Sequence, residues 1–213
     1  MKPLMQWLAA PLLLLGMAFA QAEEAVLAPI YESMNAISEL GEKERKQHEF
    51  LLEELMAYAE QLPELTEDKV LTLVWQAVVY EQYANYHGGF KGVRLAKAAK
   101  EKLEAAIEAD ASGLNGLAYT TLGLLYERTP GWPVAFGSLK NAEAMYAKGL
   151  EVHPQGVDTN FAFARFLKGI ERKEEAFQYA KQALEAQPRP YLKAYDEALQ
   201  KEALNLVGAK EGK

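Results

Sequence analysis

The sequence predicts an all-α protein, a solenoid of helix–turn–helix repeats with N-terminal helices before it and a C-terminal capping helix after it. Three observations predict this fold. Ala, Leu, Glu and Lys dominate the composition, and these residues favour helix. From residue 24 onward, apolar residues recur every three or four positions, and no segment alternates as a strand does. Three similar helix ends, LEAAIEADA, YAKGLEVHP and AKQALEAQP, each precede a new helix, which indicates an internal repeat.

Residues 1–22 are typical of a secretory signal peptide. Lys2 precedes an apolar run that ends in two overlapping Ala-x-Ala cleavage patterns at residues 18–22. Gln6 and Pro11 interrupt the run, which is short for a bilayer span of about 20 apolar residues. No Cys follows it, so no lipid anchor is expected. We therefore predict cleavage at these sites and a soluble periplasmic or secreted protein.

The composition argues against several classes of function. The 213 residues carry a net charge of −7, and none of them is Cys. Half are hydrophobic and a quarter are charged, which is typical of a folded protein. An acidic chain without a basic patch is a poor binder of nucleic acid and of anionic lipid. The lack of Cys excludes thiol catalysis and thiolate metal sites.

Residues 23–65 form the predicted N-terminal helical region. Gly41 either divides this region into two helices or kinks a single one, and Pro63 is expected to end it. The second half has one apolar stripe at helical spacing, formed by Phe50, Leu51, Leu55, Tyr58 and Leu62.

Residues 66–189 are predicted to form three helix pairs, and residues 190–213 a capping helix and tail. Thr66 is expected to cap the first helix of the first pair, because Thr is a favourable N-cap and acidic residues follow it. The HGGF stretch at 87–90 breaks that helix. Pro154 and Pro188 end the second helices of the next two pairs.

Small residues mark the points where paired helices are expected to approach closely. We identify these positions by aligning the three similar helix ends. The aligned positions are Ala99, Ala142 and Ala176, then Leu103, Tyr146 and Ala180 four residues later, then Ala106, Gly149 and Ala183.

The first helix of the second unit has a bulky residue, then Leu-Gly, then an aromatic, at Tyr119, Leu122, Gly123 and Tyr126. This pattern resembles the tetratricopeptide repeat, a helix–turn–helix unit of about 34 residues. The resemblance covers residues 67–188. It rests in the third unit on Phe163, Ala164 and Leu167, and in the first on Trp75, Val78 and Val79, with Gln82 where the aromatic is usual.

The turns of the first two units are predicted to be extended. Leu122 and Pro154 lie about seven residues farther apart than in a standard repeat, and HGGFKGVR gives the first unit a similar excess. In the second unit, prolines lower the entropy cost of ordering the turn, and its apolar side chains need burial. We expect residues 129–137 to form an ordered flap that borders the binding groove. Ser138 would cap the next helix, and the buried side chains would be Trp132, Val134 and Phe136.

Residues 116–158 are similar to a widespread group of secreted bacterial tetratricopeptide-repeat proteins, and within it to the T-component-like proteins of TRAP transport systems. The resemblance implies a periplasmic helical-repeat protein that partners a solute-binding protein and carries a small hydrophobic ligand. Two features depart from that group. Ser138 stands where an acid is usual, and the chain lacks the Cys of a lipid anchor. No catalytic residue is carried over.

Neither a metal site nor a catalytic site is expected. His48, His87 and His153 lie in three different segments, without a second ligand on the same helix face. Adjacent acid pairs diverge on a helix, and no Gly-rich phosphate loop follows a strand. The sequence therefore predicts no cofactor and no enzymatic activity.

Binding on the concave face is the predicted function, because first helices line that face in such a solenoid. The alternative for these positions is ordinary core under the N-terminal helices, and Trp132 and Phe136 are either loop anchors or ligand contacts. Two function classes stay open: an exported scaffold for a protein or peptide partner, such as a solute-binding or envelope protein, and a carrier of a small hydrophobic ligand. Neither nucleic acid nor membrane insertion after cleavage is expected. The predicted concave residues are Gln76, Tyr80, Tyr83, Thr120, Leu124, Glu127, Phe161, Arg165 and Lys168.

Overall fold

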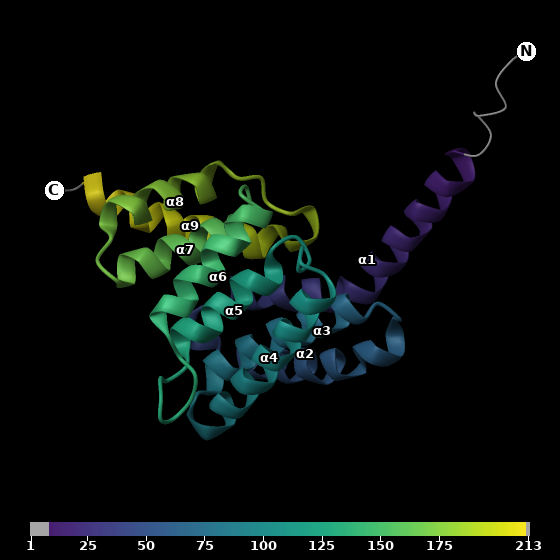
Figure 1. Cartoon of the computed structure of the whole chain (residues 1–213), viewed down its shortest axis with the longest axis horizontal. Helices are drawn as coiled ribbons and strands as arrows, with labels where there is room; N and C mark the ends of the chain where they lie inside the picture. Colours follow the sequence, from purple (N-terminus) through teal and green to yellow (C-terminus); the bar gives the residue numbers. More distant parts are fainter. Residues whose placement is uncertain (1–8, 212–213) are drawn as a thin grey trace, which may run out of the picture.

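The computed structural model describes residues 9–211, and within them the side chains of 23–41 and 43–208. This part of the chain forms nine α-helices and two short 3-10 helices and contains no strand (Figure 1), which confirms the all-α prediction. The elements are α1 (Ala9–Glu39), η2 (Glu42–Glu44), α2 (Arg45–Leu65), α3 (Lys69–His87), α4 (Gly89–Ala109), α5 (Leu117–Arg128), α6 (Leu139–Val152), α7 (Val157–Gly169), α8 (Lys173–Glu185), η3 (Pro190–Leu192) and α9 (Lys193–Glu211).

Consecutive helices pack as hairpins that stack on one another. The hairpins are α3–α4, α5–α6 and α7–α8, and α4 contacts α5 as α6 contacts α7. The first helices also touch each other, since α5 contacts both α3 and α7. At the two ends of the chain, α1 packs on α2, α9 packs on α8, and α1 and α9 contact each other. This packing is consistent with a helical repeat, and the terminal helices of the chain meet.

The aligned small positions lie inside the helix pairs, as expected. Ala99, Ala142 and Ala176 are all buried, and so are the residues at the other two aligned positions. Gly123 lies at a close contact between α5 and α6: a Cβ atom there would lie 2.7 Å from Cε1 of Tyr146. The spacing between α5 and α6 therefore depends on a residue without a side chain.

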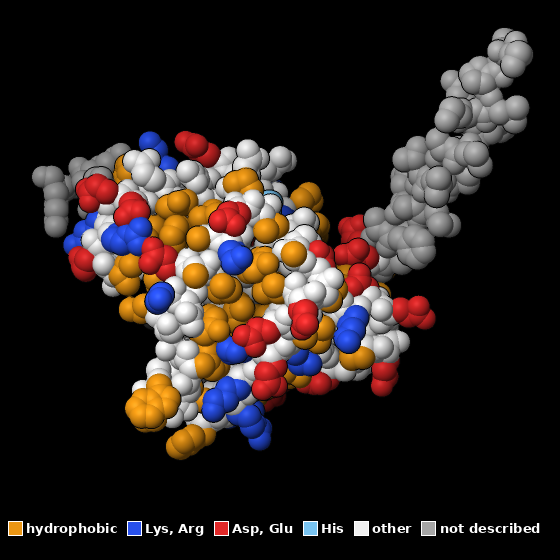
Figure 2. All heavy atoms as spheres, viewed as in Figure 1, with side chains coloured by type: hydrophobic (Ala, Val, Ile, Leu, Met, Phe, Trp, Pro, Cys, Tyr) orange, Lys and Arg blue, Asp and Glu red, His pale blue; other side chains and the backbone are white. Residues whose placement is uncertain are grey.

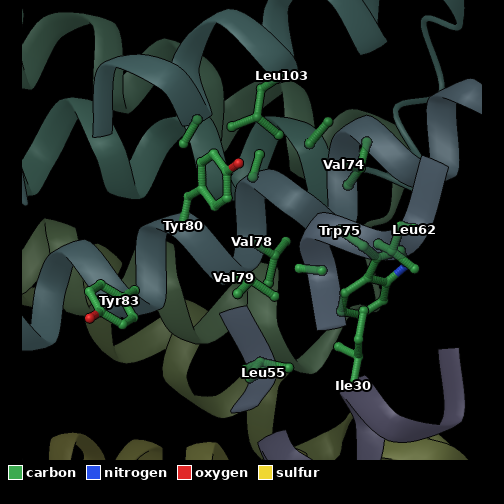
Figure 3. Close-up of a cluster of buried hydrophobic side chains, with 14 of the residues drawn as sticks. Ile30, Leu55, Leu62, Val74, Trp75, Val78, Val79, Tyr80, Tyr83 and Leu103 are labelled. Atoms are coloured by element: carbon green, nitrogen blue, oxygen red, sulfur yellow. The ribbon is translucent and has the colours of Figure 1, made fainter. Parts of the chain in front are cut away.

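The largest core lies in the first half of the molecule. Figure 3 shows Trp75 of α3 between Ile30 of α1 and Leu62 of α2, all of them buried. Leu27 and Met34 of α1 are also buried in this core. The second half of α1 is therefore part of the folded body.

Pro63 does not end the N-terminal helical region, because α2 continues through it to Leu65. Proline lacks the N–H that would bond the carbonyl four residues earlier, that of Ala59. That carbonyl accepts a hydrogen bond from Gln76 Nε2 at 2.9 Å instead. The partner for the freed carbonyl comes from the next helix, so the helix continues without an unsatisfied group. Gly41 does separate α1 from α2.

Thr66 does not cap α3. It is the C-cap residue of α2, and its Oγ1 accepts from the backbone N of Asp68 at 3.1 Å. Asp68 is the N-cap of α3, where its carboxylate accepts from the backbone N of Leu71. A carboxylate is favoured at this end of a helix because it also meets the positive end of the helix dipole.

The first unit accommodates its additional residues by lengthening its helices. α3 has 19 residues and α4 has 21, compared with 12 in α5 and 14 in α6. Gly88, with a φ of 61°, joins α3 to α4 in a tight turn. Only the second unit has an extended turn, at residues 129–138.

Backbone hydrogen bonds and one aromatic contact hold the 129–138 loop. Gly137 donates to the carbonyl of Pro130 at 2.9 Å, and Ser138 donates to that of Tyr126 at 2.8 Å. Phe136 packs edge-on against Tyr126, with ring centroids 5.5 Å apart. Ser138 caps α6, as predicted. The expected burial of Trp132 and Val134 is wrong, because their side chains are 89% and 57% exposed. The backbone hydrogen bonds and the contact of Phe136 hold the loop without them.

Residues 1–8 of the predicted signal peptide lie outside the described residues. From Ala9 the chain is helical, and the N-terminal part of α1 projects from the helical body (Figure 1). Among the described residues, no helix combines the length and the apolar character needed to cross a bilayer.

Candidate binding pocket on the concave face

A pocket of about 70 Å³ lies where the first helices of the three hairpins face the terminal helices. Thr120 and Leu124 of α5 and Phe161 and Arg165 of α7 line it, as predicted for the concave face. Glu127 lies beside it and accepts a hydrogen bond from Arg165 at 2.9 Å. Five of the nine predicted residues are thus brought together.

The predicted residues of the first unit lie elsewhere. Gln76 Oε1 accepts a hydrogen bond from Lys102 of α4 at 2.7 Å, and Gln76 Nε2 donates to the carbonyl of Ala59 of α2. The side chain of Gln76 therefore faces α2 and α4. Tyr80 donates to Glu60 of α2, and Tyr83 accepts from Lys91 of α4 at 2.6 Å.

Trp75, Val78 and Gln82 line the pocket in their place. The resemblance to the tetratricopeptide repeat predicts packing positions for these three residues, so the predicted register of α3 is rotated. Lys168 is exposed near the end of α7 and does not line the pocket.

The terminal helices narrow the concave face. Met34 of α1 and Leu192, Tyr195 and Leu199 at the C-terminal end line the same pocket. Tyr31 of α1 stacks on Tyr191 with centroids 4.5 Å apart, which holds the two ends of the chain together. This closure explains why so little of the groove expected from the first helices stays open.

Three arginines stand around the pocket, each paired with a carboxylate. Arg128 Nη1 lies 2.6 Å from Glu81 Oε1, and Arg165 Nη2 lies 2.9 Å from Glu127 Oε2. Glu127 also accepts from Tyr146 Oη at 2.5 Å.

Arg189 holds two carboxylates, from different helices. Its guanidinium contacts Asp158 of α7 at 3.0 Å and Asp196 of α9 at 2.6 Å. Burial alone would lower the pKa of Arg189, but the Asp158 and Asp196 carboxylates outweigh it and hold that pKa above its usual range. The guanidinium therefore joins α7 to α9 as a permanent cation.

The cationic groups face the solvent side of these pairs. The side chains of Arg128 and Arg165 are 30% and 31% exposed, whereas those of their partners Glu81 and Glu127 are 4% and 19% exposed. A guanidinium has five N–H donors, and one contact to a carboxylate leaves several of them for another acceptor. The pocket thus combines apolar walls with two partly exposed guanidinium groups.

Sequence reasoning missed Glu81, Arg128, Asp158 and Arg189, which all line the pocket. Glu81 could have indicated a buried ion pair from the sequence, because it is an acidic residue within the apolar α3. A buried carboxylate needs a cationic or hydrogen-bonding partner, although the sequence does not show that this partner is Arg128.

The 129–138 loop borders a different hollow. A groove of about 420 Å³ runs between the α3–α4 turn and the loop, lined among others by Phe90, Val93 and Val134. Glu81 and Arg128 line this groove as well as the concave pocket, so their ion pair separates the two. The loop therefore lies at the edge of the molecule and not over the concave face.

Within the described residues, no three His, Asp or Glu side chains lie close enough to hold a metal ion. Two of the histidines pack against aromatic rings. The ring centroids of His48 and Tyr86 are 4.5 Å apart, and those of His87 and Tyr83 are 4.1 Å apart. Neither a family model nor a curated protein matches this chain.

Proposed function

We propose that this chain is an exported scaffold of the tetratricopeptide-repeat type, which binds a protein partner by accepting one or two of the partner's side chains in the concave pocket. The three stacked hairpins and the close approach of Gly123 to Tyr146 of α6 support the repeat type. The Ala-x-Ala patterns after the apolar run support export. The proposal includes no catalytic role and no cofactor.

The size of the pocket is the observation that carries the choice of partner. Sites for small molecules enclose about 300–1,000 Å³, and the concave pocket has about 70 Å³. That volume suits a single side chain or a chain terminus and is too small for a carried ligand. The larger edge groove has enough volume for a small hydrophobic ligand, but it is open where Phe90 is exposed.

The charges of the pocket indicate the chemistry of the partner. Arg128 and Arg165 present unused N–H donors beside the apolar surface of Leu124 and Phe161. A planar guanidinium binds a carboxylate through two parallel hydrogen bonds. The partner group that fits is a carboxylate, from an acidic side chain or a C-terminus, next to an aliphatic side chain.

Site-specific photo-crosslinking in cells tests the proposal. A photoreactive residue replaces Gln82, which lines the pocket, and in a control it replaces Glu185, which is exposed on α8. We expect one discrete protein adduct from position 82, weakened by Arg165→Gln and absent from position 185. Equal adducts from both positions, or none from position 82, would contradict the proposal.

The carrier alternative has its own test. The purified protein is analysed by native mass spectrometry, before and after extraction with organic solvent. A bound small molecule that is lost on extraction, together with no adduct at position 82, would favour the carrier.

A further inference from the structure

The corner formed by the α3–α4 turn and residues 129–140 exposes large apolar side chains. Phe90 is 95% exposed and Trp132 is 89% exposed, and Val134 and Leu139 are more than half exposed. Hydrophobic side chains project at the lower left of Figure 2, where Figure 1 places these two turns. Phe90 and Val134 line the same groove, so the two turns are neighbours. Exposed apolar clusters of this kind mark contact sites.

The same two segments carry basic residues and no acidic ones, although the whole chain has a net charge of −7. Neither residues 82–100 nor residues 128–142 contain Asp or Glu. The prediction that this acidic chain has no basic patch is therefore wrong at this corner. The basic residues are Lys91, Lys97, Lys100, Lys140, Arg94 and Arg128.

Three of these cations are available to a partner. Lys100 pairs with Glu104, Arg128 pairs with Glu81, and Lys91 donates to Tyr83. Among the described side chains, those of residues 23–41 and 43–208, Arg94, Lys97 and Lys140 are exposed and form no ion pair. We call Phe90, Trp132, Arg94, Lys97 and Lys140 together the cationic corner.

We propose that the cationic corner binds the surface of a lipid bilayer that contains anionic phospholipids. Phe90 and Trp132 would enter the interfacial region, where aromatic side chains are favoured. Arg94, Lys97 and Lys140 would lie against the headgroups, whose negative potential attracts basic residues. This contact is peripheral and is independent of the proposed role of the concave pocket.

Shape and charge favour a bilayer over the other occupants. Phe90 and Trp132 come from two separate turns and both project almost fully. A fluid apolar medium can surround both tips, whereas a protein would need a matching hollow for each. In a symmetric dimer, a second copy of the chain would bring its own cationic corner against this one, and like charges disfavour that contact.

The absence of Cys from the chain allows a single fluorescent label to test the proposal. The full-length protein carries Trp132→Cys labelled with an environment-sensitive dye. The control carries the dye at Leu204→Cys, another exposed apolar position, on α9. Vesicles are made of phosphatidylcholine, alone or with one third phosphatidylglycerol. We expect a blue shift and a rise in emission at position 132 with the anionic vesicles only, and no change at position 204.

Charge removal gives the quantitative arm of the test. Arg94→Gln/Lys97→Gln/Lys140→Gln should weaken vesicle binding, read from the dye at position 132, by about fivefold for each residue and about a hundredfold in all. Lys181→Gln/Lys193→Gln/Lys201→Gln changes the net charge equally on α8 and α9 and should have little effect. Residues 1–22 are present in every variant, so they cannot cause a difference between them.

Three outcomes would overturn the proposal: no response at position 132, an equal response with neutral vesicles, or equal weakening by the two charge triples. A response at position 132 to a purified protein but not to anionic vesicles would assign the corner to a protein partner instead.

Discussion

Gly123 shows how a single residue sets the distance between two helices. Its missing side chain leaves room for the ring of Tyr146, which is fully buried and hydrogen-bonded to Glu127. Gly123→Ala would place Cβ 2.7 Å from the ring and should destabilise the protein by about 1–3 kcal/mol. Urea unfolding measures this change. Gly169→Ala, at a position with nothing within 4 Å of an added Cβ, is the control and should be neutral or slightly stabilising.

Trp132 and Phe136 belong to the same loop but should differ in their effect on stability. Trp132→Ala should change the free energy of unfolding by less than about 0.5 kcal/mol, because the indole is exposed. Phe136→Ala should cost about 1–2 kcal/mol, because its half-buried ring packs on Tyr126. Thermal melts compare the two variants. A larger loss for Trp132→Ala would show that the indole packs against the protein.

Local sequence signals predicted local features and missed distant partners. Ser138 as an N-cap and Gly88 as a turn depend on backbone geometry within a few residues, so they could be predicted. The continuation of α2 through Pro63 depends on Gln76, 13 positions later in the next helix. The exposure of Trp132 was missed for a different reason: hydrophobicity predicts burial on average, and a contact surface is the exception.

Helix pairing depends on small residues that recur at the same place in each unit. Ala142 of α6 and Ala176 of α8 are both buried. Ala142→Leu or Ala176→Leu should overpack the pair and cost about 1–3 kcal/mol, measured by thermal or urea unfolding. Ala147→Leu, on the exposed face of α6, should have little effect. Equal stability of all three variants would contradict the repeat register.

Most concave-face positions of α5 and α7 could be predicted, although Lys168 does not line the pocket, and those of α3 could not. α3 is buried from Leu71 to Glu81 with a single half-buried position, Leu73, so apolar residues surround the helix. A helix that is hydrophobic all round has no periodic signal for the direction of its concave face. The predicted positions Gln76, Tyr80 and Tyr83 were therefore rotated away from the pocket.

The whole molecule is closed by contacts between its two ends, which no local pattern could reveal. Asn35 of α1 accepts from the backbone N of Tyr195, 160 positions later, and donates to the carbonyl of Tyr191 at 2.9 Å. Arg189 forms ion pairs with both Asp158 of α7 and Asp196 of α9. These contacts turn an open concave face into a small pocket with charged groups around it.

The role of α1 leads to a prediction on two truncations. The predicted cleavage removes residues 1–22, whereas the core contacts of the described side chains begin with Val26 and Leu27. A protein that begins at Glu23 should therefore unfold with the same free energy as the full chain, within about 0.5 kcal/mol. N-terminal sequencing of the protein recovered from a periplasmic fraction should find this start or one near Gln21.

A protein that begins at Gly41 should behave differently, because it lacks Leu27, Ile30 and Met34. Each of these buried side chains contributes about 1.5–3 kcal/mol, so their loss approaches the total stability of an ordinary domain, about 5–15 kcal/mol. This truncation would also expose Trp75 and the concave pocket to solvent, so the intrinsic fluorescence of the shortened protein should shift to the red. Equal melting temperatures for the two truncations would show that α1 is not part of the folded body and that the concave face is open in solution.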